Sequence, residues 1–301
     1  MVTLSLEFEA HANYVLSVLY PESSAELVTA GMDRMIRRWK LPEPTQSKLP
    51  ALIQEVNAHA NSINSLAFTP ERQYLLSAST DTTVRMWSWP NLQLVHTLAG
   101  HKKTVAGLQV APDGKLAASA SYDRQIMLWD IPSGELQGAL KGHKRNVASL
   151  AFSLNGKVLA SAGLGEEMCI WDIPSQTMLK KLHGHKDVVG TVVFTPDERY
   201  LLSIDNASIL RLWSAAGFQL KREIQLPEVR LGSFALHPGG ELCAIGAERR
   251  ILLCYWLSGE IVEQITFKPA AIAGLAFSPD GKSLAAGFAD RKVRIWDLAS
   301  I

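Results

Sequence analysis

The sequence is poor in cysteine, in net charge and in long apolar runs. Its three cysteines are too few to cross-link a disulfide-stabilised scaffold of 301 residues. Lys and Arg number 30 against 29 Asp and Glu, so no overall charge draws the chain to nucleic acid or to an anionic membrane. No segment has the roughly 18 apolar residues of a membrane-spanning helix, and residues 1–10 lack the apolar run of a signal peptide. We therefore expect a cytoplasmic protein that does not insert into membranes.

Motifs that hold cofactors or metals are scarce as well. The sequence has no Gly-rich phosphate loop and no Cys-x-x-Cys pair. His183 and His185 stand two residues apart, but no cluster of cysteines or carboxylates completes a zinc site with them. We predict no cofactor and no metal site.

What the chain does have is an internal repeat marked by tryptophan. The members of the series are Trp39, Trp87, Trp129, Trp171, Trp213, Trp256 and Trp296. The steps between them are 48, 42, 42, 42, 43 and 40 residues, which indicates one structural unit built seven times. The longer first step comes from the Pro-rich stretch Leu41 to Pro50, which is either a plain surface loop or a projecting contact element.

The third copy shows how one unit folds. An apolar-rich stretch at 105–110 is followed by the turn signal Pro112-Asp113-Gly114 and by a run of small residues at 116–121. Further strand-like stretches follow at 125–129 and 136–140. Four short strands separated by turns, with no segment of helical periodicity, predict an all-β antiparallel meander.

Two dipeptides frame this copy, Gly100-His101 at its start and Trp129-Asp130 near its end. In five copies the histidine precedes the tryptophan by 28 residues, at His11, His59, His101, His143 and His185. This pattern resembles the WD-repeat (WD40) β-propeller family over the whole chain. The resemblance implies a seven-bladed β-propeller of four-stranded antiparallel blades, formed as a single domain by residues 1–301.

The two ends of the chain complement each other in this reading. The last copy stops shortly after Trp296 without a fourth strand of its own. Residues 2–8 are strand-like and precede His11, as fourth strands precede the histidines of other copies. We predict that this N-terminal strand closes the last blade, which removes two exposed sheet edges.

Two copies contain His, Ser, Asp and Trp in a pattern that superficially resembles an acyl-transfer triad. The family resemblance implies instead a structural, hydrogen-bonded tetrad, and repetition of the set argues for a scaffold rather than a nucleophile. The predicted tetrads are His59, Ser79, Asp81 and Trp87, and His101, Ser121, Asp123 and Trp129. We predict no catalytic residue, and hence no enzyme.

Other copies lack one or more members of this set. The first has Gly31 at the serine position, the fourth and fifth have Gly165 and Ala207 at the turn Asp, and the sixth has Arg250 there. The seventh keeps Asp290 but has no histidine. We predict that copies four to six are less rigidly tied than copies two and three.

Cys243 and Cys254 flank a predicted turn symmetrically, so a simple hairpin would place them opposite each other. Two packed thiols are favoured over a disulfide in a reducing compartment, and the bridge stays an alternative.

In this family, partners often dock on the top face, around the mouth of the central channel. Either a solvated rim or a binding surface is expected at the positions that the resemblance implies there, which are Tyr14, Leu16, Met32, Ser62, Asn64, Thr80, Thr104, Tyr122, Asn146, Val188, Arg230 and Arg249. Tyr and Arg frequently dominate binding energy at interfaces. Our hypothesis is that an acidic or amphipathic peptide crosses this face, with its carboxylates near Arg230 and Arg249.

The sequence therefore predicts a non-catalytic protein–protein interaction scaffold with a peptide-binding top face. It would act as a subunit or adaptor of a larger complex, in which it is a monomeric ring. A nucleic-acid-binding propeller is the first alternative, and it would use the basic sector of Lys221, Arg222, Arg230, Arg249 and Arg250. A catalytic propeller is the second, and it would need converging carboxylates or histidines outside the tetrads.

Overall fold

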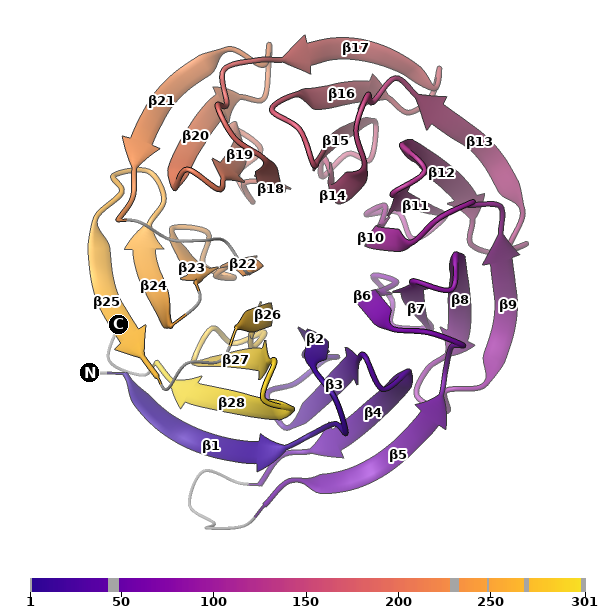
Figure 1. The fold of residues 1–301 in the computed structure, drawn as a ribbon, viewed down its shortest axis with the longest axis vertical. Coiled ribbons are helices and arrows are strands. Elements are labelled where there is room, and N and C mark those ends of the chain that lie inside the picture. Colours follow the sequence, from indigo (N-terminus) through magenta and orange to yellow (C-terminus); the bar gives the residue numbers. More distant parts are fainter. Residues whose placement is uncertain (1, 43–48, 228–232, 248, 268–270, 299–301) are drawn as a thin grey trace. The chain divides into compact units, whose positions relative to one another are not determined.

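The computed structural model describes residues 2–42, 49–227, 233–247, 249–267 and 271–298. Within these ranges all regular structure is β, in seven four-stranded antiparallel sheets (Figure 1). No helix that could cross a membrane is found in the described ranges. Most of the stretch Leu41 to Pro50 falls on residues 43–48, which lie outside these ranges. The chain divides into two compact units, residues 1–63 with 229–301 and residues 64–228, and each is described by itself.

The first unit contains three sheets. One is built by β2 (Val15–Leu19), β3 (Glu26–Gly31), β4 (Met35–Lys40) and β5 (Ala51–Asn57). A second is built by β22 (Ser233–Leu236), β23 (Leu242–Gly246), β24 (Arg250–Tyr255) and β25 (Ile261–Thr266). The third has the order β1-β28-β27-β26, with β1 (Thr3–Glu9), β26 (Ile272–Phe277), β27 (Ser283–Phe288) and β28 (Lys292–Asp297).

The second unit contains four sheets, each formed by strands consecutive in the chain. The first two are β6 (Ile63–Phe68), β7 (Tyr74–Ser79), β8 (Thr83–Ser88) and β9 (Leu94–Ala99), then β10 (Val105–Val110), β11 (Leu116–Ser121), β12 (Gln125–Asp130) and β13 (Leu136–Lys141). The other two are β14 (Val147–Phe152), β15 (Val158–Gly163), β16 (Met168–Asp172) and β17 (Thr177–Leu182), then β18 (Val189–Phe194), β19 (Tyr200–Asp205), β20 (Ile209–Ser214) and β21 (Leu220–Gln225).

The N-terminal strand completes the last sheet, as predicted. β1 pairs antiparallel with β28, with Thr3 opposite Asp297 and Phe8 opposite Val293. Phe8 also packs edge-on against Trp39 of the neighbouring sheet, with ring centroids 5.0 Å apart. The predicted fold class, a seven-bladed β-propeller whose last blade takes its outer strand from the N-terminus, is confirmed.

Within the second unit, small residues on β11 let neighbouring sheets pack face to face. In the sheet β10–β13 of the third repeat, Ala118 and Ala120 of β11 are buried in a cluster with Val147 and Trp171 of the sheet β14–β17 of the fourth repeat. Trp129 lies in the equivalent cluster between the sheets of the second repeat (β6–β9) and the third repeat (β10–β13). Trp129 and Trp171 are only 2% and 1% exposed, so each of these two contributes a large apolar area to a core that its own sheet cannot form.

The two cysteines of the sheet β22–β25, which belongs to the sixth repeat, face each other. Cys243 on β23 is the register partner of Cys254 on β24, and their Sγ atoms lie 3.3 Å apart. Both side chains are buried free thiols.

Candidate functional site

The third repeat carries a complete four-residue network. The Nδ1–H of His101 donates to the Asp123 carboxylate at 2.8 Å. On the other side of the ring, Nε2 lies 2.8 Å from Ser119 Oγ, which also accepts the indole N–H of Trp129 at 2.8 Å. Asp123 accepts a further bond from the backbone N–H of Lys102 at 2.9 Å. The network ties the loop before β10 to the turn between β11 and β12.

The serine of this network is Ser119, and the prediction of Ser121 was wrong. Ser121 Oγ donates to the Lys103 carbonyl at 3.1 Å and accepts the Asp123 N–H at 3.1 Å, so it supports the turn. Residues 119 and 121 point to the same face of the strand, because side chains alternate with a period of two. The sequence pattern fits both positions. Ser119 is the network residue because its hydroxyl, and not that of Ser121, accepts the hydrogen bond from the Trp129 indole N–H.

The second repeat shows the same shift. The indole N–H of Trp87 donates to Ser77 Oγ at 2.9 Å, so Ser77 takes the place predicted for Ser79. Ser79 Oγ accepts the Asp81 N–H at 3.0 Å. His59, in the loop before β6, is buried.

The first repeat is complete despite Gly31. Thr29 supplies the hydroxyl, since its Oγ1 lies 2.7 Å from His11 Nε2 and accepts the Trp39 indole N–H at 2.9 Å. His11 Nδ1 donates to Asp33 at 2.8 Å. Burial opposes ionisation of Asp33, yet hydrogen bonds from His11 and Arg37 hold the pKa of that carboxyl well below its usual range.

The fifth repeat also has a carboxylate, although Ala207 occupies the turn position. Asp205, at the end of β19, accepts from His185 Nδ1 at 2.7 Å and pairs with Arg211 at 3.1 Å. Ser203 Oγ lies 2.7 Å from His185 Nε2. The prediction that the fifth repeat is less rigidly tied assumed that it has no carboxylate, but Asp205 supplies one.

These networks have no accessible nucleophile. Ser119 is 0% exposed, and its hydroxyl oxygen is bonded to both His101 and Trp129. Burial lowers the pKa of His185, against the opposing effect of the hydrogen bond to Asp205. A neutral imidazole between a hydroxyl and a carboxylate fits a structural tie better than a triad that must admit a substrate.

The fourth repeat lacks the carboxylate. Ser161 is in place, because its Oγ lies 2.6 Å from His143 Nε2 and accepts the Trp171 indole N–H at 2.7 Å. Gly165 stands at the turn position, and the contact of His143 Nδ1 is the Cys169 Sγ at 3.8 Å. Burial, with a contribution from Lys181, lowers the pKa of His143 to about 4.

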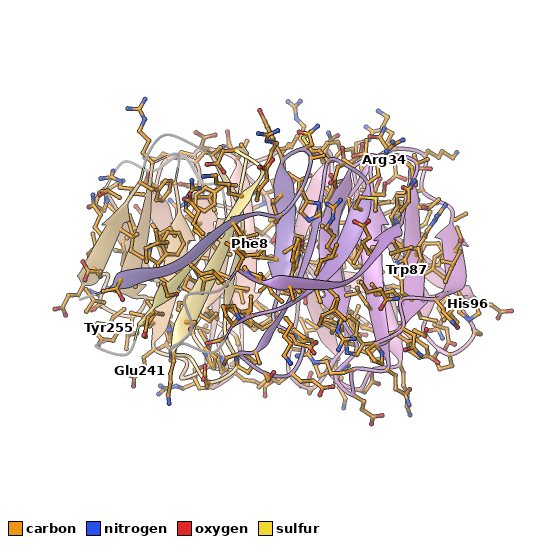
Figure 2. All side chains as sticks on the ribbon, turned by 90° about the horizontal axis from the view of Figure 1, so that it is seen from below. Phe8, Arg34, Trp87, His96, Glu241 and Tyr255 are labelled. Atoms are coloured by element: carbon orange, nitrogen blue, oxygen red, sulfur yellow. The ribbon has the colours of Figure 1, made fainter. Side chains whose placement is uncertain are left out.

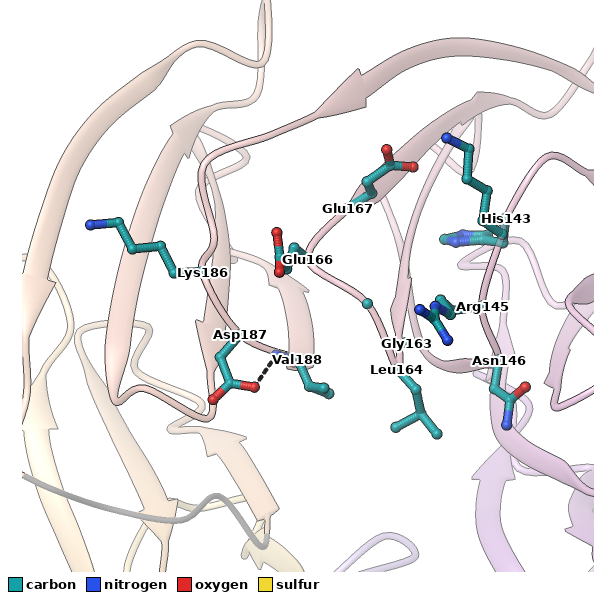
Figure 3. A pocket seen from close by; sticks show the side chains of 12 residues that line it. His143, Arg145, Asn146, Gly163, Leu164, Glu166, Glu167, Lys186, Asp187 and Val188 are labelled. Atoms are coloured by element: carbon teal, nitrogen blue, oxygen red, sulfur yellow. Dashed lines mark hydrogen bonds between the residues drawn. The ribbon is translucent and has the colours of Figure 1, made fainter.

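A cavity of about 370 Å³ opens at this turn (Figure 3). It is lined by residues 143–146 of the loop before β14, residues 163–167 between β15 and β16, and residues 186–188 before β18. The turn also tightens one residue earlier than in the third repeat, with Gly165 N–H bonded to the Gly163 carbonyl at 2.7 Å. The missing side chain and the changed turn together leave the space open.

The cavity lies among what we call the top-face loops, which are the loops that carry the repeat histidines together with the turns between second and third strands. Figure 2 shows, within the first unit, Arg34 in such a turn and Glu241 in a turn at the opposite ends of the strands. Of the predicted top-face residues, Asn146 and Val188 line the cavity together. Sequence reasoning missed His143 and Arg145 as cavity residues, although Gly165 at an Asp position was a signal for them.

The other predicted top-face residues are divided between the units. In the first unit, Tyr14 and Met32 are 46% and 40% exposed, and the Met32 N–H donates to the Tyr14 carbonyl at 2.9 Å, so the two are neighbours. Leu16 is half-buried and Arg249 is exposed. Arg230 lies outside the described residues.

In the second unit, Asn64 forms a link between sheets. Its side-chain amide donates to the Val105 carbonyl at 2.8 Å and to Thr80 Oγ1 at 3.1 Å. Tyr122 is half-buried, and its backbone N–H donates to the Thr104 carbonyl at 2.9 Å. Asn64 therefore has a structural role, because its side chain links two neighbouring sheets.

His183 and His185 lie in different surroundings. His185 belongs to the fifth network, whereas His183 is exposed, with Nδ1 at 3.8 Å from Glu167. Among the described residues, no group of three or more His, Cys, Asp or Glu side chains is placed to hold a metal ion.

Comparison with known proteins agrees with this architecture. The profile of the family described as "WD domain, G-beta repeat" matches residues 3–40, 50–88, 92–130, 134–172, 176–214 and 262–297. The chain therefore belongs to the WD-repeat family. The matched segments leave out residues 215–261. Arg250, predicted at the turn position of the sixth repeat, is instead the first residue of β24 and pairs with Thr266, so that prediction was wrong.

A relative is similar to part of the chain. The "Periodic tryptophan protein 2 homolog" of Schizosaccharomyces pombe is 30% identical over 74 residues. The similarity covers 24% of this chain and 9% of the relative, so the chain spans only a small part of that protein's length.

Proposed function

We propose that the protein is a non-catalytic interaction scaffold, a subunit or adaptor of a larger complex that binds protein segments with its top-face loops. The observation that carries this proposal is that polar side chains of the repeat networks are buried, whereas apolar side chains of those loops are accessible. Repeat hydroxyls and imidazoles are buried in structural bonds, as for Ser119 and His101. The accessible features are apolar side chains such as Tyr14 and Met32 and the cavity at the fourth repeat. Accessible apolar groups beside fixed polar groups suit peptide recognition better than bond-making.

Membership of the WD-repeat family supports protein partners, since the family's fold is typical of interaction scaffolds. The basic sector is less suited to a nucleic-acid backbone. On β21, Lys221 and Arg222 are followed directly by Glu223, which pairs with Arg211 at 2.7 Å. An interrupted stripe lacks the continuous positive field that phosphate binding uses. We also propose a cytoplasmic location, because Cys169, Cys243 and Cys254 are free thiols.

Cross-linking in the native cell tests this proposal, because lysines stand at both ends of the sheets. Lys102, Lys144 and Lys186 lie in top-face loops, whereas Lys115, Lys157 and Lys282 lie in the turns between first and second strands. After affinity purification and lysine cross-linking, we expect partner cross-links on the first group. Cross-links confined to the second group, or binding abolished by nuclease, would contradict the proposal.

A further inference from the structure

The third and fourth repeats align with a constant offset of 42 residues, which places Gly165 where Asp123 stands. In the third repeat, Asp123 accepts two bonds, from His101 Nδ1–H and from the Lys102 backbone N–H. In the first repeat, Asp33 likewise accepts from His11 and from the Ala12 backbone N–H at 3.0 Å. In both of these repeats the carboxylate at this position is held by one imidazole and one backbone amide.

The fourth repeat keeps both donors without the carboxylate. His143 and Lys144 correspond to His101 and Lys102, and Ser161 fixes the His143 ring through Nε2 at 2.6 Å. Neither the Lys144 backbone N–H nor His143 Nδ1 meets a carboxylate among the described residues. In the third repeat Nδ1 carries the proton, because it faces the Asp123 carboxylate. A carboxylate at His143 Nδ1 requires the same tautomer, in which the Ser161 hydroxyl donates to Nε2 at 2.6 Å.

The space beside these donors is large enough for a side chain of a partner. At about 370 Å³, the cavity exceeds the roughly 30 Å³ share of one water molecule many times. Arg145 points from its loop toward the turn that carries Gly165 (Figure 3). A Cβ built on Gly165 would lie 3.3 Å from Arg145 Cγ, so the aliphatic stem of Arg145 forms one wall.

We propose that this cavity binds the carboxylate of an Asp or Glu side chain from a partner peptide, which takes the place that Asp123 fills in the third repeat. Leu164, 44% exposed, and Val188 border the same cavity and would contact apolar neighbours of that acidic residue. The inference rests on the proposed scaffold function and names the chemical group that one of its sites takes.

The charges of the lining favour a single carboxylate over a polyanion. Lys144, Arg145 and Lys186 line the cavity, but so do Glu166, Glu167 and Asp187. Glu167 is bonded to Lys181 at 3.0 Å, and Asp187 accepts the backbone N–H of Val188. A phosphate backbone would meet these carboxylates repeatedly, whereas one acidic side chain between apolar neighbours would meet the Lys144 backbone N–H, His143 Nδ1 and Arg145.

The test uses capped amino acids as probes on the full chain. N-acetyl-aspartate N-methylamide is titrated against protein with ¹⁵N-labelled histidine, and the matched N-acetyl-asparagine N-methylamide is the control. We expect a saturable shift of the His143 Nδ1 resonance with the aspartate probe and at least a tenfold weaker response with asparagine. Equal responses to the two probes would overturn the proposal, as would no response to aspartate.

Two variants locate the site. Gly165→Asp places a carboxylate of the chain's own in the cavity and is expected to abolish the response, with Gly165→Asn as the control of equal size. Gly165 does not have a positive φ, and Arg145 at its side is an exposed, flexible neighbour, so both replacements can be accommodated. Arg145→Gln is expected to weaken aspartate binding several-fold. Undiminished binding to folded Gly165→Asp would overturn the assignment, and if that variant fails to fold, unchanged binding to Arg145→Gln would do so.

Two further arms separate this inference from the scaffold function. If a captured partner keeps its cross-links to the top-face loops and its affinity in Gly165→Asp, the scaffold function stands and the carboxylate site falls. If free succinate shifts His143 and the capped aspartate does not, the ligand is a small acid and the peptide proposal falls.

Discussion

The third and fourth repeats differ in one carboxylate and are otherwise built alike. Both bury their tryptophan, and both hold the imidazole through a serine hydroxyl, at 2.8 Å in the third and 2.6 Å in the fourth. Yet Asp123 ties loop to turn in one, whereas Gly165 leaves two donors and a cavity in the other. The comparison teaches that packing and the Ser–Trp bond build the sheet, and that the turn carboxylate can be removed to open a site.

The largest effects should be equal in the two repeats. We expect Trp129→Ala and Trp171→Ala each to lower the free energy of unfolding by about 3–5 kcal/mol, because both replacements leave cavities between sheets. Urea denaturation monitored by circular dichroism measures both. A cost in one repeat more than twice that in the other would show that the sheets are not equivalent.

A difference should appear on acidification. The pKa of His143 lies at about 4 instead of its usual 6.5, since burial disfavours the charged ring. The unfolded chain therefore takes up the proton first, and stability present above about pH 6.5 is lost as the pH falls toward 4, by about 3 kcal/mol at most for this group.

Thermal unfolding across this pH range checks the expectation, with Gly165→Asp as the comparison. A carboxylate beside Nδ1 should raise the pKa of His143 and make the loss of stability smaller. A steeper loss in Gly165→Asp than in the natural sequence would contradict it.

A serine pair sharpens the description of the third network. Ser119→Ala should cost about 2 kcal/mol, because it leaves the buried Trp129 N–H and the His101 ring without their partner. Ser121→Ala should cost about 1 kcal/mol, since it removes only bonds within the turn. Chemical denaturation measures the free energy of unfolding of both variants. A larger loss for Ser121→Ala than for Ser119→Ala would indicate that Ser121 is the network residue.

The smallest effect is a gain. Gly165→Asp should stabilise the fourth repeat by about 1 kcal/mol, because the new carboxylate would accept hydrogen bonds from the Lys144 backbone N–H and from His143 Nδ1. Hydrogen exchange should show slower exchange of the Lys144 backbone N–H in this variant than in Gly165→Asn. Equal exchange in the two variants would mean that the carboxylate does not reach the donors.

Much of the fold could be predicted because its signals are local and repeated. The spacing of Trp87 and Trp129, the turn at Pro112 and the small residues of β11 each specify a short strand or turn, and seven copies reinforce one another. The pairing of β1 with β28 was also predictable, since the last repeat lacked a strand and the N-terminus offered one. Opposition of Cys243 and Cys254 followed from hairpin symmetry.

The site was less predictable because hydrogen bonds depend on the third dimension. Ser119 and Ser121 share one strand face, so periodicity alone cannot choose between them. Asp205 reaches His185 from the end of a strand instead of from the turn where the repeat pattern placed its carboxylate. Thr29 in the first repeat could not be predicted from the pattern, because the pattern places the hydroxyl two residues later, where Gly31 stands.

By itself, the sequence determined the number of repeats, the strands within each and the strand that completes the last sheet. These depend on periodicity and turn chemistry, which are properties of residues near one another in the chain. Only the tertiary structure decided which hydroxyl meets each tryptophan and which residues surround the space at Gly165. Those outcomes depend on distances of a few ångströms between separate loops, because a hydrogen bond or a cavity exists only where packing brings its groups together.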